Sequence, residues 1–251
     1  MLKIIPVKNK NEGGKITAKI IIDMINEKEN ATLGLATGSS PESTYKELVM
    51  AYERGKVSFD KVRTINLDEY VGVPKDSDQS YHFYMYDRLF SKVDIREENI
   101  NIPNGMAEDL DEECKRYNDV IRSLSPVDIQ LLGIGHNGHI GFNEPSEAFA
   151  MGTHVVELSK STIEANSRFF DDESQVPKQA ITMGVGQIMK ARNIVLLAFG
   201  LDKSEILYRA LYGVVSSLCP ASILQKHDNL IVVADYDAIT HIRNKTPDFE
   251  N

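Results

Sequence analysis

The sequence predicts an α/β fold, a three-layer, Rossmann-like domain with a mostly parallel central sheet. The first observation is that short β-branched runs alternate with longer stretches of helical period to the end of the chain. Several of these runs are also apolar almost throughout, as strands buried on both faces should be. Finally, 42% of the 251 residues are hydrophobic, enough for a substantial core. Such alternation is typical of helices packed on both faces of a parallel sheet.

Six strands are expected, each a short apolar or β-branched run. They span residues 2–5, 32–36, 62–67, 128–134, 193–199 and 230–234. Two helices are indicated by apolar residues at helical spacing, namely Ile16, Ile20 and Met24, then Tyr45, Leu48 and Tyr52. Further helices are expected near residues 81–90, 110–121, 162–170 and 203–211. Because no linker or repeat interrupts this order, residues 1–251 are expected to form a single domain.

Composition argues against several classes of protein. The chain has 28 basic and 37 acidic residues, a net charge of −9, so its surface should repel nucleic acid and anionic lipid. No apolar run approaches 18 residues, and the first residues lack a secretory signal, so neither a membrane span nor export is expected. Cys114 and Cys219 have no metal-binding or redox spacing, which suits a reducing cytoplasm.

The loop after the second predicted strand is a candidate anion site, because ligands of such folds bind at the carboxyl ends of strands. Ser40 is placed to cap the next helix, and Pro41 suits its first position. Thr37, Ser39 and Ser40 offer hydroxyls beside the free amides of a helix start, and Gly38 allows close backbone approach. An ordinary capped helix explains these residues equally well. The loop has no Lys, so it is not a nucleotide-binding P-loop.

Residues 133–138 match the G-x-G-x-x-G pattern of dinucleotide sites directly after a predicted strand. That pattern should continue into a helix. Residues 139–145 resist a helix because they include Gly141 and Pro145. A dinucleotide site is therefore only a minor alternative.

The same loop carries residues suited to proton transfer. Histidine is the residue type suited to proton transfer at cellular pH, which makes His139 a candidate. Glu144 is close enough along the loop to orient its imidazole, and Asn137 adds a neutral hydrogen-bonding group. Metal binding by His136, His139 and Glu144 is an alternative, although a glycine-rich stretch provides no helical face for zinc ligands. A merely structural, hydrogen-bonded loop is the third interpretation.

Three further residues are candidates from other segments. Asp68 follows an apolar run at a strand end, where it could be a general base at a buried edge or an ordinary turn or cap residue. Arg168 and Lys203 are candidate phosphate-binding cations. Isolated Arg and Lys usually lie at the surface, so spacing alone does not single these two out.

Taken together, these segments resemble the glucosamine-6-phosphate deaminase (isomerase) family over nearly the whole chain. The resemblance rests on long motifs in the right order, at residues 35–41, 66–72, 79–81, 133–145 and 165–170. The wider superfamily also includes 6-phosphogluconolactonases and ribose-phosphate isomerases. Residues 68–72 and 141–145 look like the deaminase branch.

The resemblance implies conversion of glucosamine 6-phosphate and water into fructose 6-phosphate and ammonia, without a metal or an organic cofactor. It implies that His139, oriented by Glu144 and Asn137, opens the sugar ring. Asp68 would then move a proton from C2 to C1. Because this chain has the neutral Asn137 where some relatives carry Asp, the imidazole pKa need not equal theirs.

The same resemblance implies that Arg168 and Lys203 hold the phosphate together with Thr37, Gly38, Ser39 and Ser40. It also implies that residues 158–178 form a mobile lid that excludes water. The partner expected is thus a small amino-sugar phosphate.

The sequence is also compatible with three alternative functions. A hydrolase of the 6-phosphogluconolactonase kind would need His139 as a base but not Asp68. A galactosamine-6-phosphate isomerase would act on a substrate that differs in the orientation of one hydroxyl. A non-catalytic sugar-phosphate sensor would bind without turnover. The oligomeric state is not predicted, because the family includes monomers and larger assemblies.

Overall fold

The computed structural model describes residues 1–159, 163 and 176–246. In this part of the chain, a seven-stranded sheet has the order β1-β10-β9-β6-β2-β3-β5, with all neighbours parallel. Its strands are β1 (Leu2–Val7), β2 (Thr32–Leu35), β3 (Arg63–Asn66), β5 (Ile100–Asn101), β6 (Ile129–Gly133), β9 (Ile194–Ala198) and β10 (Leu230–Asp235). All six predicted strands are confirmed. Within this sheet, among the described residues, the two-residue edge strand β5 is the one strand that was not predicted.

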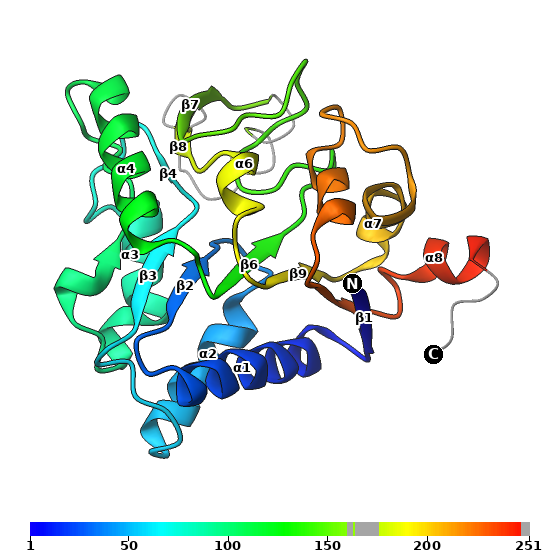
Figure 1. The fold of residues 1–251 in the computed structure, drawn as a ribbon, viewed down its shortest axis with the longest axis horizontal. Helices are drawn as coiled ribbons and strands as arrows, with labels where there is room; N and C mark the ends of the chain where they lie inside the picture. Colours follow the sequence, from blue (N-terminus) through cyan, green and yellow to red (C-terminus); the bar gives the residue numbers. More distant parts are fainter. Residues whose placement is uncertain (160–162, 164–175, 247–251) are drawn as a thin grey trace.

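Helices cover both faces of this sheet (Figure 1). One face packs against α1 (Lys10–Glu27), α2 (Glu42–Glu53) and α3 (Tyr81–Arg88). The other packs against α4 (Leu110–Leu124), α6 (Val185–Ile188), α7 (Ser204–Tyr212), α8 (Thr240–Lys245) and the 3₁₀ helix η5 (Pro220–Lys226). The predicted three layers are therefore confirmed. The helix expected at residues 162–170 lies, apart from residue 163, outside the described residues.

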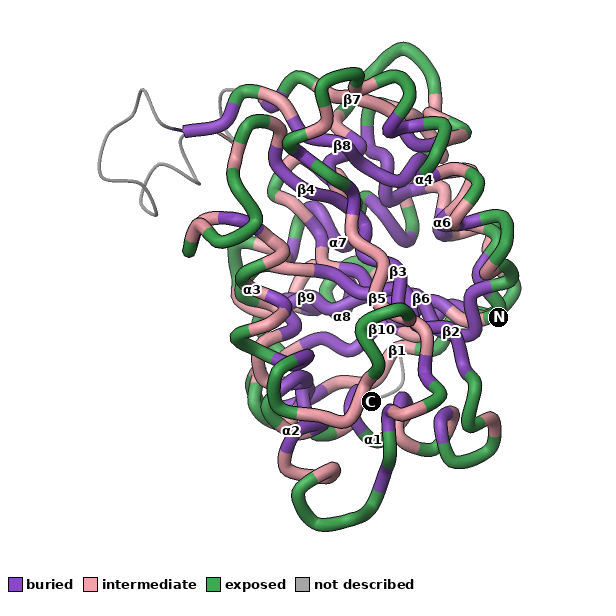
Figure 2. The backbone as a smooth tube through the Cα atoms, turned by 90° about the vertical axis from the view of Figure 1, so that its left-hand side faces the viewer, coloured by how far each residue is buried: buried purple, intermediate pink, exposed green. Residues whose placement is uncertain are grey.

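Two hydrophobic cores lie on either side of the sheet because successive strand residues point to opposite faces. On β6, Leu131 packs into the core beneath α1 and α2, whereas Leu132 packs into the core beneath α7. Both side chains are fully buried. Figure 2 shows the buried strands at the centre of the molecule. No helix in the described part of the chain is long and apolar enough to cross a membrane.

A second, three-stranded antiparallel sheet lies at the carboxyl edge of the first. It consists of β4 (Asp68–Tyr70), β8 (Gln179–Thr182) and β7 (His154–Glu157), in that order. Leu67 joins the two sheets, since its amide donates to the Leu35 carbonyl (3.1 Å) and its carbonyl accepts from Met183 (2.7 Å). Asp68 is thereby placed at the junction of the two sheets.

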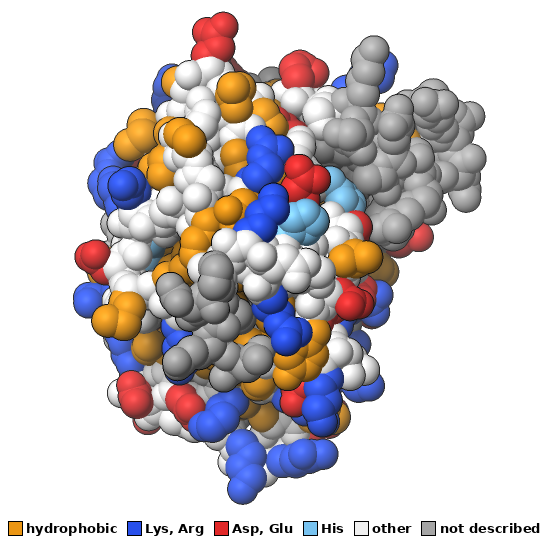
Figure 3. Space-filling model, turned by 90° about the vertical axis from the view of Figure 1, so that its right-hand side faces the viewer, with side chains coloured by type: hydrophobic (Ala, Val, Ile, Leu, Met, Phe, Trp, Pro, Cys, Tyr) orange, Lys and Arg blue, Asp and Glu red, His pale blue; other side chains and the backbone are white. Residues whose placement is uncertain are grey.

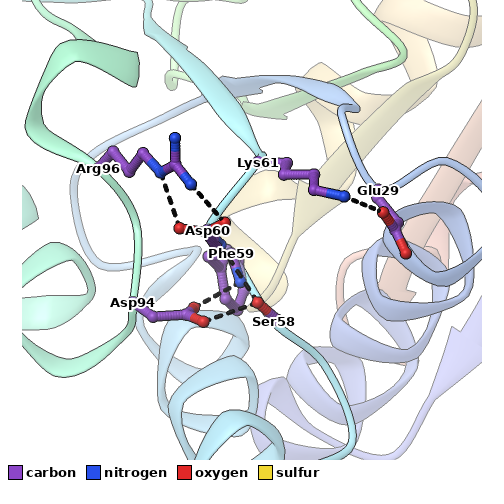
Figure 4. A network of polar contacts seen from close by, with 7 residues as sticks. All are labelled: Glu29, Ser58, Phe59, Asp60, Lys61, Asp94 and Arg96. Atoms are coloured by element: carbon purple, nitrogen blue, oxygen red, sulfur yellow. Dashed lines mark hydrogen bonds and ion pairs between the residues drawn. The ribbon is translucent and has the colours of Figure 1, made fainter.

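Polar contacts join two loops at the amino ends of β3 and β5, at the end of the main sheet away from the second sheet. Figure 4 shows that Arg96 reaches Asp60 through two hydrogen bonds of 2.8 Å. Nearby, Asp94 accepts from the Ser58 hydroxyl at 2.7 Å. These contacts join the segment before β3 to the segment before β5. They lie far from the carboxyl ends of the strands, so they support the fold rather than the site.

Candidate functional site

A cavity of about 470 Å³ opens at the carboxyl ends of β2, β6 and β9. It is lined by these residues predicted from the sequence: Thr37, Gly38, Ser39, Ser40, Asp68, Asn137, His139 and Lys203. Glu144 contacts two of them from behind. Arg168 lies outside the described residues, as does most of the 158–178 segment. The fold therefore brings together candidates from four separate segments.

The loop after β2 presents its backbone and hydroxyls to the cavity. Gly38 has a φ of +85°, which favours glycine, and its carbonyl accepts from the Tyr84 hydroxyl at 2.6 Å. The prediction that Ser40 caps the next helix is wrong. The capping residue is Pro41, in a helical conformation and without a side-chain cap, so α2 begins only at Glu42. The Ser40 side chain lines the cavity instead.

Asp68 is almost completely buried, with 4% of its surface exposed. Burial, and after it the charge of Glu69, raise the pKa of its carboxyl group to about 8, against a hydrogen bond from the Phe142 amide that lowers it. A carboxyl group whose pKa lies near cellular pH can both take and return a proton. The prediction of a buried strand-edge Asp is thus confirmed, and its role as a base stays a proposal.

Glu69 faces away from Asp68 and holds the start of α3. Its carboxylate accepts hydrogen bonds from the amides of Tyr81 (2.9 Å) and His82 (2.8 Å). Burial raises the pKa of this carboxyl group to about 7, against those hydrogen bonds. Since Tyr81 lines the cavity, Glu69 links the strand that carries Asp68 to the helix that closes one wall.

His139, Asn137 and Glu144 form one hydrogen-bonded group. The Asn137 amide donates to the Glu144 carboxylate, and its oxygen accepts from the His139 backbone amide at 3.1 Å. Nδ1 of His139 lies 3.2 Å from Oε1 of Glu144, at ion-pair distance but without hydrogen-bond alignment. The Glu144 side chain is 10% exposed. The predicted juxtaposition of these three residues is confirmed.

Gly135 allows the His139 ring to lie close to the backbone. A Cβ atom at residue 135 would be 2.3 Å from Nε2 of His139, which no real packing permits. The Gly135 amide also donates to the His139 carbonyl at 3.0 Å. Within this glycine pattern, Gly135 is therefore the residue that makes room for the imidazole.

The described structure supports neither minor alternative for this loop. Residues 134–153 form no helix, so the G-x-G-x-x-G segment does not continue as a dinucleotide site should. Nε2 of His136 contacts Oδ2 of Asp202 at 2.7 Å, while His139 faces Glu144. The described residues include no group of three or more His, Cys, Asp or Glu side chains placed to hold a metal ion.

Lys203 is the predicted cation that the structure places in the cavity. Its side chain is only 16% exposed, and burial lowers the pKa of its amine while Asp202, at 3.9 Å, opposes that change.

Figure 3 shows one face of the molecule on which basic, acidic and hydrophobic side chains are intermixed. On that face the acidic side chains do not form one continuous patch.

Several lining residues were not singled out as site residues from the sequence. They include Lys10, Tyr81, Phe199 and Asp202. The Tyr81 hydroxyl donates to the Tyr70 hydroxyl at 3.0 Å. The Tyr81 ring stacks on the Phe142 ring, with their centroids 5.9 Å apart. Its only sequence signal is its place in the 79–81 motif. Lys10 lies in the first turn of α1, and no sequence pattern there marks it as a site residue.

Comparisons with known proteins agree on one family. A profile of the glucosamine-6-phosphate isomerases/6-phosphogluconolactonases matches residues 10–233. The chain is 47% identical over 241 residues to the glucosamine-6-phosphate deaminase of Thermoanaerobacter sp. (strain X514), which covers 96% of this chain and 95% of the relative. It is 46% identical over 241 residues to that of Clostridium novyi (strain NT), covering 96% and 100%.

Solved structures show the same relationship. A monomeric glucosamine-6-phosphate deaminase superposes with a TM-score of 0.92 and 45% identity, covering 95% of this chain and 99% of that one. A 6-phosphogluconolactonase from Thermotoga maritima superposes with a TM-score of 0.74 and 20% identity, covering 94% and 100%. The second similarity shows a shared fold only.

Proposed function

The chain belongs to the family of glucosamine-6-phosphate isomerases and 6-phosphogluconolactonases, and within it we propose that this protein is a glucosamine-6-phosphate deaminase. It converts glucosamine 6-phosphate and water into fructose 6-phosphate and ammonia. The observation that carries this proposal is that a buried carboxyl group, Asp68, lines the same cavity as His139, whose imidazole lies beside the Glu144 carboxylate. The relatives near 47% identity named as deaminases support it.

Opening of the sugar ring is assigned to His139. The imidazole takes the proton of the anomeric hydroxyl and returns a proton to the ring oxygen as the C1–O bond to that oxygen breaks. Glu144 stabilises the positively charged imidazole between these two transfers, and Asn137 holds the Glu144 carboxylate in place.

The carbon chemistry is assigned to Asp68. Its carboxylate removes the C2 proton of the open aldehyde, which gives an enolamine with a negative C1 oxygen. Asp68 then returns the proton to C1, and a proton of the amine moves to the C1 oxygen, which gives the imine of fructose 6-phosphate. Water then adds to C2 and ammonia leaves. A carboxylate is a weak base toward carbon, so positioned hydrogen-bond donors must stabilise the enolamine.

The phosphate is assigned to the anion site beside Lys203. The amides and hydroxyls of Thr37, Ser39 and Ser40 bind its oxygens, and Lys203 supplies a positive charge. Arg168 is proposed as a second cation. The segment 158–178 around it is proposed as a lid that closes over the sugar.

The wider setting is also part of the proposal. We assign residues 1–251 to one domain that acts in the cytoplasm on a small amino-sugar phosphate, with no nucleic-acid partner. The two cysteines, Cys114 and Cys219, are both free and buried, which is compatible with a reducing compartment.

A panel of three substrates tests the assignment. The protein is incubated with glucosamine 6-phosphate, galactosamine 6-phosphate and 6-phosphogluconolactone, and ammonia, ketose phosphate and acid release are measured. The proposal expects ammonia and fructose 6-phosphate from the first substrate, at the highest kcat/KM of the three. Preferred hydrolysis of the lactone would instead assign the protein to the lactonase branch.

A further inference from the structure

We propose that Lys10 is a further phosphate-binding residue of this cavity, which exchanges an ion pair with Glu42 for the phosphate of the bound sugar. The inference rests on the proposed function, because it takes a sugar phosphate as the ligand. Lys10 lines the same cavity as Lys203 and the loop of residues 37–40, although it is distant from both in sequence.

Close packing of the first turn of α1 places Lys10 there. A Cβ atom on Gly13 would lie 2.6 Å from the Phe199 ring, and one on Gly14 would lie 2.5 Å from Oγ of Ser43. The Ser43 hydroxyl also donates to the Lys10 carbonyl at 2.9 Å. The first turn is therefore held between the turn that follows β9 and the start of α2. Those are the two segments next to the other phosphate-binding groups.

Glu42, the present partner of Lys10, forms only a weak ion pair with it and also lies near a second cation, Arg88. Nζ of Lys10 lies 3.4 Å from Oε2 of Glu42, and the two side chains are 34% and 41% exposed. Exposed ion pairs of this kind contribute little to stability, so breaking the Lys10–Glu42 pair in favour of a phosphate contact costs little free energy. The other Glu42 oxygen lies 3.8 Å from the Arg88 guanidinium, so Glu42 keeps a positive partner when Lys10 turns away.

The charges around Lys203 favour a second lysine. Among the described lining residues the lysines are Lys10 and Lys203, and Lys203 lies 3.9 Å from the Asp202 carboxylate. A phosphate monoester carries up to two negative charges at neutral pH, and Asp202 opposes part of the attraction of Lys203 for it. Lys10 approaches from the α1 side without such a neighbouring acid inside the cavity, because Glu42 does not line it.

Substitution of Lys10 and Glu42 tests the exchange. Lys10→Met is expected to raise the Kd of fructose 6-phosphate, measured by calorimetry, about three- to tenfold. The KM for glucosamine 6-phosphate should rise in parallel, with kcat within about twofold of the unsubstituted protein. Glu42→Gln should lower the Kd, since it frees Lys10. The matched control is Lys46→Met on α2, outside the lining of this cavity, and it should change neither value.

A double-mutant cycle then identifies the mechanism. In the Lys10→Met background, Glu42→Gln should have no effect on the Kd. An unchanged Kd in Lys10→Met, or an equal effect of Glu42→Gln in both backgrounds, would overturn the role of Lys10. Inorganic phosphate serves as a second probe and should weaken in Lys10→Met as well.

Binding and turnover separate the two proposals. If fructose 6-phosphate binding depends on Lys10 but no ammonia is released from glucosamine 6-phosphate, the role of Lys10 stands and the deaminase assignment falls. If turnover is normal but binding is the same in Lys10→Met, the assignment stands and the role of Lys10 falls. A protein that binds neither fructose 6-phosphate nor inorganic phosphate overturns both.

Discussion

Nδ1 of His139 lies 3.2 Å from Oε1 of Glu144, and the Asn137 amide donates to the same carboxylate. The carboxylate is thus oriented before any substrate arrives. Because both side chains are largely buried, the negative charge acts on the imidazole with little screening by water. The carboxylate is therefore placed to stabilise the positive charge that the imidazole carries between the two proton transfers of ring opening.

The Glu144→Gln variant tests this relationship. The variant removes the negative charge that lies beside the imidazole during ring opening, so kcat/KM should fall about 10²-fold, within the range of general acid–base contributions. The binding of fructose 6-phosphate should change little. Steady-state kinetics and calorimetry on the same preparation check both expectations. Unaltered kinetics would show that Glu144 does not act on the imidazole.

Gly135→Ala should displace the His139 ring without changing any of the acid–base groups of the site. The added Cβ would lie 2.3 Å from Nε2, so the imidazole must move, and kcat/KM should fall about 10²-fold. Gly133→Ala is the matched variant in the same loop, since its Cβ would meet Oγ of Ser40 only at 3.7 Å, an ordinary contact. The loss in Gly133→Ala should be much smaller. Equal losses would contradict the packing argument.

The pH dependence of kcat/KM should report Asp68. The raised pKa of about 8 means that Asp68 becomes protonated as the pH falls below 8, and a protonated carboxyl group is no base. We therefore expect kcat/KM to decline on the acid side of a midpoint near 8. Glu69→Gln removes a like charge, which should move that midpoint to lower pH. Substrate ionisation is the same in both proteins, so an unshifted midpoint would refute the assignment.

Asp68→Asn should stabilise the fold at alkaline pH. The pKa of Asp68 is raised from 3.8 to about 8, so the folded state binds more protons than the unfolded state between these values. Stability from this group is present below pH 3.8 and is lost as the pH rises through 8. The difference in Tm between Asp68→Asn and the unsubstituted protein should therefore grow by several degrees in favour of the variant between pH 5 and pH 9. In a protein of this size, 1 kcal/mol changes the Tm by about 2–4 °C. Thermal unfolding at both pH values measures it, and a pH-independent difference would contradict it.

The parallel sheet was predictable because its strands are buried on both faces and show as continuous apolar runs. β9, for example, is buried at every position from Ile194 to Ala198. The smaller sheet gave no such signal, since β4 has three residues and its pairing with β8 links distant parts of the chain. Strand pairing of this kind depends on tertiary structure, which a local pattern does not contain.

The site was predictable where polar residues follow strands and unpredictable where packing selects them. Asp68 and His139 stand out because each interrupts or follows an apolar run. Lys10 has no such context, and its place in the cavity depends on the close approach of Gly13 to Phe199. The Ser40 cap was predicted wrongly because Pro41 takes a helical conformation and becomes the cap itself.

The most direct test of the central claim is the release of products from glucosamine 6-phosphate by the intact protein and by Asp68→Asn, with chelator present and nucleotide absent. We predict equimolar ammonia and fructose 6-phosphate from the intact protein, and a loss of about 10³-fold or more in the variant, which should still bind fructose 6-phosphate. No turnover by the intact protein would contradict the assigned function. Full activity of Asp68→Asn would contradict the assigned base.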